Sequence, residues 1–513
     1  MILRNQRKRR FATVGRALVI LLMTIVPSTA LAHTKLVRSQ PKANEVLSQT
    51  PKLIELWFTE ELEPGLTSID VSDEQSNRVD KGSVALSEGN KKATIELGEL
   101  RPGVYTVAWK TVSADQHVIR DRFAFSVEAS SAGVTSSTPG PFGTPEHGVP
   151  TGETVSEQEQ GEQVSSDQIL VRWLSYLAMM TLFGGFAFRS FVLVPSLRYS
   201  HDGPNQVTAR TATEARVLVL LWLSIALLAL TTLVALIQQA SAVFDKSFVQ
   251  SLSPSLWVQT LRTGYGASWI LQIASLVVLG MILFLLKRQV KRYPAKEHSV
   301  FWWLGLVASA GLLVAPSWTG HALASAKDFR LAVFADWLHL LAGGFWVGAL
   351  FHLALVLPRA LASVPKPRRA IAVHQFITRF TRVAIPSVVL LVLAGLYNAW
   401  THIPGLRAIW TTPYGKTLAL KLFVVGVMLL LGALNNFHFG KRAARLVDAQ
   451  KTNSDVTSLA RLERSFRRSV TLEAGLGVVV LVVTAVLVFL TPARSHPAMT
   501  SNDTEPGVVW DKR

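Results

Sequence analysis

The stretch FADWLHLLAGGFWVGAL, at residues 334–350, is apolar along most of its length and yet contains an aspartate and a histidine. An apolar run of this kind predicts a helix that spans a membrane. Asp336 and His339 are three residues apart, so they share one face of that helix. Ionisable groups are costly in hydrocarbon and tend to face the interior of a helix bundle. The glycine pair and the later Gly348 and Ala349 predict close approach of a neighbouring helix.

Similar apolar runs recur on both sides of this stretch. They predict an all-α membrane bundle over residues 167–492, followed by a short tail at 493–513. Hydrophobic residues make up 49% of the chain, which fits a protein with several spans. About eight helices are expected, over residues 169–194, 215–239, 264–286, 300–316, 331–357, 377–400, 416–438 and 470–490.

The 52 lysines and arginines outnumber the 34 acidic residues, and most lie between apolar runs. Such charges set the orientation of membrane helices, so we expect them on the cytoplasmic side and expect no nucleic-acid partner. Basic loops alternate with loops of few positive charges, which predicts that both ends of the mature chain lie outside. The chain has no cysteine, which excludes disulfides and thiolate metal sites. The basic loops contain Arg189 and Arg210, residues 287–296, residues 359–369 and residues 441–468.

The first 32 residues have the pattern of a secretory signal peptide. A basic start, MILRNQRKRR, precedes the apolar stretch ALVILLMTIV, and ALA at 30–32 is a small-x-small cleavage site. Cleavage after Ala32 makes His33 the first residue of the mature chain, and an uncleaved membrane anchor is the alternative. A histidine at a free N-terminus offers a metal two nitrogens, the α-amine and the imidazole, whereas an internal histidine offers one.

Residues 33–128 predict a small all-β domain. GVYTVAWKTV at 103–112 places Tyr105, Val107 and Trp109 on one face, and RFAFSV at 122–127 alternates in the same way. Several short strands separated by turns favour an antiparallel sandwich or barrel. Residues 129–166 are rich in Ser, Thr, Pro, Gly, Glu and Gln, which is typical of a flexible linker.

Asp115 and His117 lie two residues apart in this domain, a spacing that points both side chains to one face of a strand. With the amine and imidazole of His33 they offer three nitrogens and one oxygen, which suits Cu(II) in square or tetragonal geometry. The amine binds only after it loses its proton, so we expect the affinity to fall at acid pH. The alternative is that the pair marks a solvated strand end.

This domain resembles the CopC family of periplasmic copper-binding proteins. The resemblance rests on HTKLVRSQPKANEVL, IELWFTEELEPG and YTVAWKTVSADQHVIRDRFAFSV, and covers nearly all of residues 33–128. It implies a Greek-key, Ig-like sandwich or barrel whose Cu(II) site is made by His33, Asp115 and His117, with Glu60 as the nearest candidate for an additional acid. Residues 33–128 contain no methionine, so we expect Cu(II) rather than Cu(I) at this site.

In the membrane half, SWTGHAL places His321 just before the helix that holds Asp336 and His339. Two imidazoles and a carboxylate near the outer surface are able to pass a copper ion inward, so these three residues are the candidates for a transport pathway. A structural ion pair between Asp336 and Lys421 is the alternative interpretation, and the two are compatible.

Other polar residues of the spans leave two interpretations open. Asn435, Asn436, His438 and Glu473 form either an inner exit or an interhelical hydrogen-bond lock, and the lock is favoured. His352 belongs either to the core or to the pathway.

The methionines of the spans are candidate soft ligands for Cu(I), although methionine in a membrane helix usually serves packing. They are Met179, Met180, Met281 and Met428. The remaining histidines are expected as solvated residues of loops or of the linker: His147, His201, His298, His374 and His402.

The membrane half resembles the CopD copper-resistance family. SWTGHAL, ADWLHLLAGGFWVGAL, TPYGKTLALKLFVVGVMLLLGALNN and RRSVTLEAGLGVVVL carry the resemblance, which is strongest over residues 317–490. It implies copper transport across the cytoplasmic membrane, often uptake, with His321, Asp336 and His339 at the family's His and Asp positions. A CopC-like domain followed by a CopD-like domain resembles a known type of fusion.

The sequence therefore predicts a copper-binding multi-pass protein of the cytoplasmic membrane, with its β domain outside, that captures Cu(II) and takes part in copper import. We expect no enzyme activity, and no Walker or DKTG motif of an ATP-driven pump is present. Copper ions and the lipid bilayer are the expected partners, and a separate copper reductase or chaperone remains open. A redox or haem protein, or a surface protein that sequesters copper, is the alternative.

Overall fold

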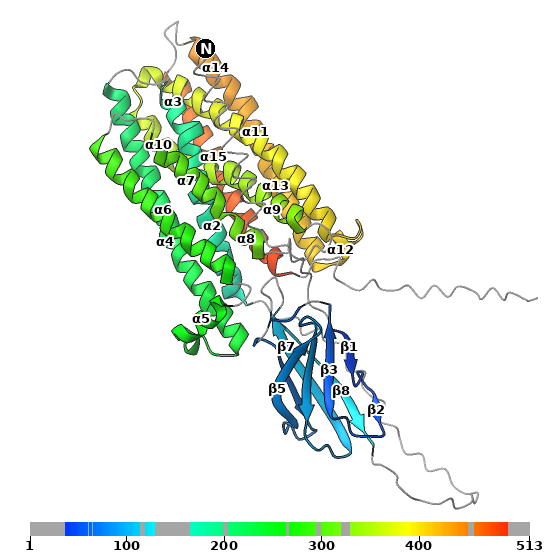
Figure 1. The fold of residues 1–513 in the computed structure, drawn as a ribbon. Helices are drawn as coiled ribbons and strands as arrows, with labels where there is room; N and C mark the ends of the chain where they lie inside the picture. Colours follow the sequence, from blue (N-terminus) through cyan, green and yellow to red (C-terminus); the bar gives the residue numbers. More distant parts are fainter. Residues whose placement is uncertain are drawn as a thin grey trace, which may run out of the picture.

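The computed structural model describes residues 36–59, 61–63, 65–112, 118–128, 165–198, 204–262, 266–293, 299–319, 329–449 and 456–490. These residues form a β domain and a long helical bundle, with the β domain at one end of the bundle (Figure 1). We call this the docked end, and α5 (Pro254–Leu261) and α12 (Ala408–Thr411) lie there too (Figure 1). The opposite end carries α3 (Val194–Arg198) and α14 (Lys441–Ala449).

The β domain contains two four-stranded sheets, with strand orders β1-β3-β6-β5 and β2-β8-β7-β4. The pairing is antiparallel, except that β2 runs parallel to β8. The prediction of a small all-β sandwich is therefore confirmed. The strands are β1 (Leu36–Gln40), β2 (Val46–Leu47), β3 (Leu53–Phe58), β4 (Ser68–Ser72), β5 (Asp80–Ser87), β6 (Lys92–Leu97), β7 (Gly103–Val112) and β8 (Val118–Val127).

Alternation along the strands explains how the two sheets pack together. Tyr105, Val107 and Trp109 of β7 are buried, as the sequence predicts, while the residues between them are more exposed. Trp109 meets Phe58 of the other sheet edge to face, with ring centroids 5.1 Å apart, and Tyr105 stacks on Phe125 of β8. Aromatic pairs of this kind add about 0.5–1.5 kcal/mol to the burial of the rings. The aromatic side chains thus join both sheets into one core.

The apolar runs of the second part form long helices, several of which continue through a short π-helical or 3-10 segment. Their bounds are α2 (Ser166–Phe188), η1 (Arg189–Leu193), α4 (Pro204–Phe244), η2 (Gln250–Leu252), α6 (Gly266–Arg292), α7 (Val300–Leu312), α8 (Val314–Thr319), α9 (Phe329–Gly343), η4 (Gly344–Gly348), α10 (Ala349–Ser363), η5 (Lys366–Arg368), α11 (Arg369–His402), α13 (Pro413–Leu434), η6 (Asn435–Gly440) and α15 (Val456–Phe489).

Eight helices of the described residues are long and apolar enough to cross a membrane, as the sequence predicts. The chain is accordingly a multi-pass membrane protein. The fourth span, expected at 300–316, is the shortest and is divided between α7 and α8. The first begins at Ser166, so the last residue assigned to the linker is helical. The spans are Ser166–Arg198, Arg210–Phe244, Gly266–Arg292, Val300–Trp318, Arg330–Ser363, Arg369–His402, Pro413–Val447 and Leu459–Phe489.

The glycines of the fifth span allow the close helix contact that the sequence predicts. Helix α2 packs against α4, α10, α15 and η4, and it is the most buried of the spans. At the crossing with η4, a Cβ atom built on Gly184 would lie 2.1 Å from the carbonyl carbon of Gly348. Two backbones can approach this closely only where both residues lack a side chain. The contact fixes α2 against the helix that carries Asp336 and His339.

Candidate functional site

Asp336 and His339 both lie on the side of α9 that faces α11. The Asn398 side-chain amide donates a hydrogen bond to Asp336 Oδ1 at 3.3 Å, and His339 Nδ1 lies 3.2 Å from the Leu391 carbonyl oxygen. The prediction that the two residues share a face is therefore confirmed. Because a carbonyl oxygen only accepts hydrogen bonds, Nδ1 of His339 carries the proton in this contact, and the neutral ring then has its lone pair on Nε2.

Three further side chains approach Asp336 from other helices. Ser317 of α8 lies near the carboxyl group, although its hydroxyl donates a hydrogen bond to the Leu313 carbonyl oxygen at 3.5 Å. His402 of α11 and Lys421 of α13 interact with Asp336 electrostatically. Ser317 is fully buried. We call Asp336, Ser317, Asn398, His402 and Lys421 the Asp336 group. Four helices are needed to assemble it, so the group depends on the tertiary fold.

Lys421 lies close enough to Asp336 to interact with it electrostatically, but too far away for the direct ion pair that the sequence suggests. Its charge acts on both Asp336 and His339. In the described part of the chain, no ion pair within 4.0 Å joins Lys421 to Asp336. Lys421 therefore lies near Asp336 without a direct ion pair, and the hydrogen bond that reaches the carboxyl group within the described residues comes from Asn398.

His402 is a residue that the sequence interpretation missed, because it was assigned to a solvated loop. It is the last residue of α11 and is half-buried. Its Nδ1 lies 2.5 Å from the Asn398 carbonyl oxygen, and its ring stacks on Tyr414 with centroids 6.2 Å apart. The spacing of Asn398 and His402, four residues apart at the end of an apolar run, is the signal that would have found it. The loop assignment of His374 is also wrong, since that residue lies within α11.

At the opposite end of the bundle, the expected interhelical lock is present. The Asn435 amide of η6 donates a hydrogen bond to Glu473 Oε2 of α15 at 2.8 Å, and both side chains are buried. The Thr381 hydroxyl of α11 donates to Asn436 Oδ1 at 3.3 Å. These bonds tie three spans together. The predicted interhelical hydrogen bonds of Asn435, Asn436 and Glu473 are therefore confirmed.

His352 and three of the four methionines are part of the packing. His352 is fully buried, its Nδ1 lies 3.1 Å from the Gly348 carbonyl oxygen, and its ring packs against Phe188. Met281 is 57% exposed on the outside of the bundle. Met179, Met180 and Met428 are buried in the apolar core.

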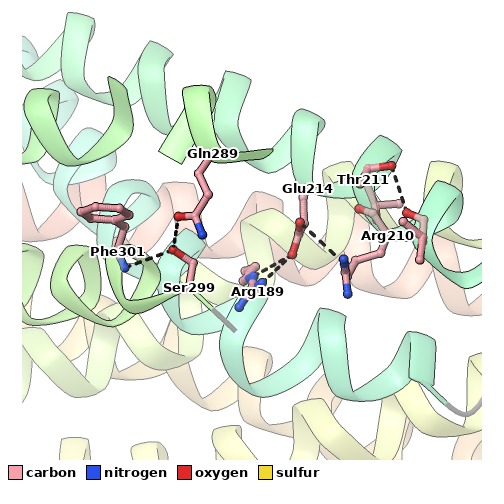
Figure 2. A network of polar contacts seen from close by, with 9 residues as sticks. Arg189, Arg210, Thr211, Glu214, Gln289, Ser299 and Phe301 are labelled. Carbon is pink, nitrogen blue, oxygen red and sulfur yellow. Dashed lines mark hydrogen bonds and ion pairs between the residues drawn. The ribbon is translucent and has the colours of Figure 1, made fainter. Parts of the chain in front are cut away.

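A buried charge cluster near the opposite end corrects the view that Arg189 and Arg210 are loop residues. Both side chains are buried and converge on Glu214 of α4, as Figure 2 shows. Arg189 Nη2 donates to Glu214 Oε1 at 2.6 Å, and the Arg210 Nε atom lies 3.9 Å from Oε2. The Arg189 guanidinium also lies over the ring of Trp302. Removing one partner of such a buried pair leaves an uncompensated charge, which costs about 3–5 kcal/mol.

The β domain contacts the helical bundle through a charged group at the end of α4. Lys110 Nζ of β7 donates to the Val243 carbonyl oxygen at 3.0 Å and to the Asp245 carboxylate. Arg120 Nη2 of β8 donates to the Ala242 carbonyl oxygen at 3.0 Å and to Asp245 Oδ1 at 2.6 Å. Burial raises the pKa of Asp245, but the hydrogen bonds and charges of Lys110 and Arg120 outweigh it and hold this pKa below its ordinary value.

An apolar cluster lies beside these charges. Leu66, Val112 and Val118 of the β domain are buried together with Val243. Val112 and Val118 pair across β7 and β8 and are the last and first residues of those strands. We call this cluster and the Lys110, Arg120 and Asp245 contacts the docking contact. It places both ends of the β7–β8 connection at the bundle.

Five candidate ligands fall outside the described residues, so their positions stay predictions. Among the described residues, no group of three or more histidines, aspartates or glutamates is placed to hold a metal ion. The structure therefore brings together Asp336, His339 and their neighbours as polar groups, without a complete ligand set in the described ranges. The five are His33, Glu60, Asp115, His117 and His321.

Three family models match successive parts of the chain. They are the CopC domain over residues 36–128, the N-terminal domain of copper resistance protein D-like proteins over residues 165–331, and copper resistance protein D over residues 374–487. Copper resistance protein D of Pseudomonas syringae pv. tomato is 30% identical over 329 residues, which are 63% of this chain and 96% of that protein. The chain belongs to the CopD family, fused to a CopC domain.

Two further comparisons concern the whole fusion and the β domain. Copper transport protein CutJ of Bacillus subtilis is 26% identical over 486 residues, which are 94% of this chain and 78% of that protein. The crystal structure of CopC from Methylosinus trichosporium OB3b is 29% identical, with a TM-score of 0.17, and covers 19% of this chain and 94% of that chain. The families matched by this CopC–CopD fusion concern copper resistance and copper transport, so the chain is a copper-related membrane protein.

Within the CopC–CopD fusion, residues of the Asp336 group come from both segments that match the membrane-domain family models. Ser317 lies in the N-terminal CopD-like domain, whereas Asn398, His402 and Lys421 lie in the CopD domain. Asp336 and His339 lie between the two matched segments.

Proposed function

We propose that this CopC–CopD fusion captures Cu(II) outside the cell with its β domain and delivers copper to the Asp336 group for import across the cytoplasmic membrane. The docking contact is the observation that carries the proposal. It joins the domain whose family binds copper to the domain whose relatives are copper transport and resistance proteins.

The capture site consists of His33, Asp115 and His117. Asp115 and His117 belong to the connection of residues 113–117, and the residues on either side of it, Val112 and Val118, are buried at the docking contact. Both ends of this connection therefore lie next to the bundle, where we propose that copper is released. A covalent fusion also raises the concentration of the donor near the acceptor, to roughly millimolar for a short flexible tether.

The receiving site consists of Asp336 and His339, with His321 as the third candidate. A carboxylate and an imidazole Nε2 are ligands that copper accepts. Cu(I) is also able to bind here if a reductant first reduces the Cu(II). The ammonium of Lys421 balances the Asp336 carboxylate when no metal is bound. Because the charge of Lys421 also repels a bound cation, it weakens copper binding at Asp336 and favours release.

The docked end faces the outside in this proposal. The β domain lies at that end, and α14 with its basic residues Lys441, Arg442 and Arg445 lies at the opposite end (Figure 1). Positive residues favour the cytoplasmic side of a membrane. The orientation that obeys this rule exposes the β domain outside.

The test is the copper content of cells grown under copper limitation. At matched expression, the intact protein is expected to raise the content above that of an empty vector, and His339→Ala and Asp336→Asn are expected to abolish the rise. His438→Ala is the matched control, because this histidine is exposed at the opposite end of the bundle. Content below the vector would indicate export. Equal content in all strains would leave a surface protein that sequesters copper as the better explanation.

A further inference from the structure

Glu473 of α15 is a buried carboxyl group of the membrane domain that the proposed copper path does not use. Its side chain is 2% exposed and belongs to the span Leu459–Phe489. Ionisable groups inside a membrane normally have a function or a specific partner. The hydrogen bond from the Asn435 amide to Oε2 accounts for one of the two carboxyl oxygens. The surroundings of the other oxygen indicate what else the group binds.

The hydrogen bonding between Glu473 and Asn435 is incomplete as long as Glu473 is ionised. Glu473 Oε1 and Asn435 Oδ1 are both buried, and neither has a hydrogen-bond partner among the described residues. Both atoms are then acceptors, so neither is able to satisfy the other. A proton on the carboxyl group changes this, because a carboxylic acid has an O–H donor. Protonation therefore supplies the donor that this buried pair lacks.

In the described part of the chain, no positive charge compensates an ionised Glu473. Besides Asn435, the carboxyl group interacts with the indole of Trp346, which is a neutral donor. A buried group without a counter-charge is more stable in its neutral form.

The elements that pack against α15 are α2, α10, α13, α14 and η6. Within the described ranges, none of their charged or titratable residues interacts with Glu473. On α15 itself, Glu463 interacts with Arg369 and Arg467 instead. Five residues of the packed elements, one from each, make contacts elsewhere: Arg172, His352, Lys421, His438 and Lys441.

The space beside Glu473 suits a proton better than a metal ion. Gly432 of α13 packs against the carboxyl group, and a Cβ atom built on this glycine would lie 3.3 Å from Oε1. Metal ions that bind carboxylate and amide oxygens need several further oxygen ligands. No such set of acidic or histidine side chains surrounds Glu473 among the residues that the structure describes. The ligand that fits this site is therefore a proton.

The contact joins the two spans that carry the candidate receiving site and its neighbouring ammonium. Trp346 lies in η4, in the same span as Asp336 and His339, and Asn435 begins η6, in the same span as Lys421. Both η4 and η6 are π-helical. Such turns inside α-helices are rare, occur frequently at functional sites and are places where helices kink. A change at Glu473 therefore acts where both spans are able to bend.

Water reaches this site most directly from the end of the bundle opposite the β domain. Arg468 is exposed and lies five residues before Glu473 on α15, which is about 8 Å along a helix at 1.5 Å per residue. The same end carries the basic helix α14 (Figure 1). In the proposed orientation this is the cytoplasmic end.

We propose that Glu473 is a proton-binding site, which holds its proton while the Asn435–Glu473 contact is closed and releases it to water at the cytoplasmic end when the contact opens. The ionised carboxylate then requires water, which an opened contact admits, so deprotonation favours separation of α13 from α15. The protonation of Glu473 is independent of the proposed function, whereas control of copper passage by this contact rests on it.

Infrared spectroscopy of the full-length protein in nanodiscs at neutral pH tests the protonation. The spectrum of the intact protein minus that of Glu473→Gln is expected to contain the carbonyl band of a protonated carboxyl group. Glutamine keeps a donor and an acceptor beside Asn435, so this variant is expected to fold. Glu463→Gln is the matched control, because it removes a partly buried glutamate of the same helix that interacts with two arginines, and it should remove no such band.

A protonated-carboxyl band of equal size in the intact protein and in Glu473→Gln would overturn the proton site. If Glu473→Gln does not fold, the intact protein is labelled with carbon-13 at the side-chain carboxyl carbon of glutamate. The label is expected to shift the band, and an unshifted band would overturn the proposal in that case.

Copper uptake into proteoliposomes tests the control of passage. The internal pH is set before a Cu(II) salt is added outside, with or without ascorbate as reductant. Uptake by the intact protein is expected to be faster at higher internal pH, because loss of the Glu473 proton favours the open contact. Glu473→Gln has no such proton to lose, so its uptake is expected to be independent of internal pH and at least about fivefold slower, the lower end of typical coupling between two sites.

Glu463→Gln should behave as the intact protein does. The same dependence on internal pH in the intact protein and in Glu473→Gln would overturn the control of passage. Absence of uptake by the intact protein would refute the proposed function and leave the infrared result standing.

Discussion

Asp245, just beyond the end of α4, accepts a hydrogen bond from Arg120 of the β domain at 2.6 Å. The two residues are 125 positions apart in the chain. Together with Lys110, they hold the strands that flank the candidate copper-binding connection against the membrane domain. Asp245 is thus one of several contacts that hold the β domain against the bundle, beside the carbonyl oxygens of Ala242 and Val243 and the apolar cluster.

Charge reversal at this carboxylate is expected to loosen the β domain. In Asp245→Lys, two attractive interactions become repulsive, and partly exposed ion pairs of this kind contribute about 0.2–1 kcal/mol each. The population of the docked arrangement should therefore fall several-fold. Spin labels are attached to the exposed Ser87→Cys in β5 and the exposed Ser255→Cys in α5. Loss of the docked arrangement should broaden the distribution of distances between them.

The matched control is Glu99→Lys, which makes the same charge change at an exposed position of the β domain. It should leave the distances unchanged. Lys110→Glu with Arg120→Glu in the Asp245→Lys background should restore them. A narrow distribution in Asp245→Lys alone would refute the role of the ion pairs.

The docking contact is also expected to persist well into the acid range. The pKa of Asp245 lies below its ordinary value, so its contribution is complete above about pH 4, the ordinary aspartate value. As the pH falls through the lowered pKa, the carboxylate gains a proton and the contribution is lost. The same spin-label distances should be constant from pH 7.5 to pH 5 and broaden only in stronger acid. Broadening near pH 6 would implicate a different group.

Substitution of Gly184 is expected to destabilise the bundle. In Gly184→Ala the new Cβ atom would lie 2.1 Å from the Gly348 carbonyl carbon, and neither backbone can yield cheaply. Overpacking of this kind costs about 1–3 kcal/mol or more. The melting temperature of the purified protein in detergent, followed by tryptophan fluorescence, should fall by several degrees.

Gly280→Ala is the control, because a Cβ atom on Gly280 meets nothing within 4 Å. Alanine is the better helix former, so this variant should melt no lower than the intact protein. Equal melting temperatures for Gly184→Ala and the intact protein would show that the helices do not cross this closely.

Features that depend on local pattern were predictable from the sequence. The alternation of Tyr105, Val107 and Trp109 marked a strand face, and the length of each apolar run marked a span. Asp336 and His339 were predicted to share a face because three-residue spacing determines that on any helix. In each case the physical cause acts within a few residues.

Features that depend on tertiary contact were not predictable. Lys110 and Asp245 lie 135 residues apart, and neither differs in sequence from a solvated charge. His402 and Arg189 were misassigned for a related reason, since a polar residue at the end of an apolar run is equally compatible with a loop and with a buried helix end.

The proposed chelation of Cu(II) by the amine and imidazole of His33 is tested by a single added residue. An additional alanine before His33 removes the amine from the ligand set and leaves the imidazole in place. Cu(II) affinity of the purified full chain should fall at least about 10–100-fold, the loss typical when even an outer-shell partner of a metal site is removed. For the unextended chain, the affinity should rise about tenfold per pH unit between roughly pH 6.5 and pH 8, where the α-amine loses its proton, and more steeply below about pH 6.5, where the imidazoles also do. Competition with a chromogenic chelator measures both effects, and His147→Ala, in the expected linker, should change neither. An unchanged affinity in the extended chain would mean that copper is bound without the amine, by Asp115, His117 and ligands yet to be assigned.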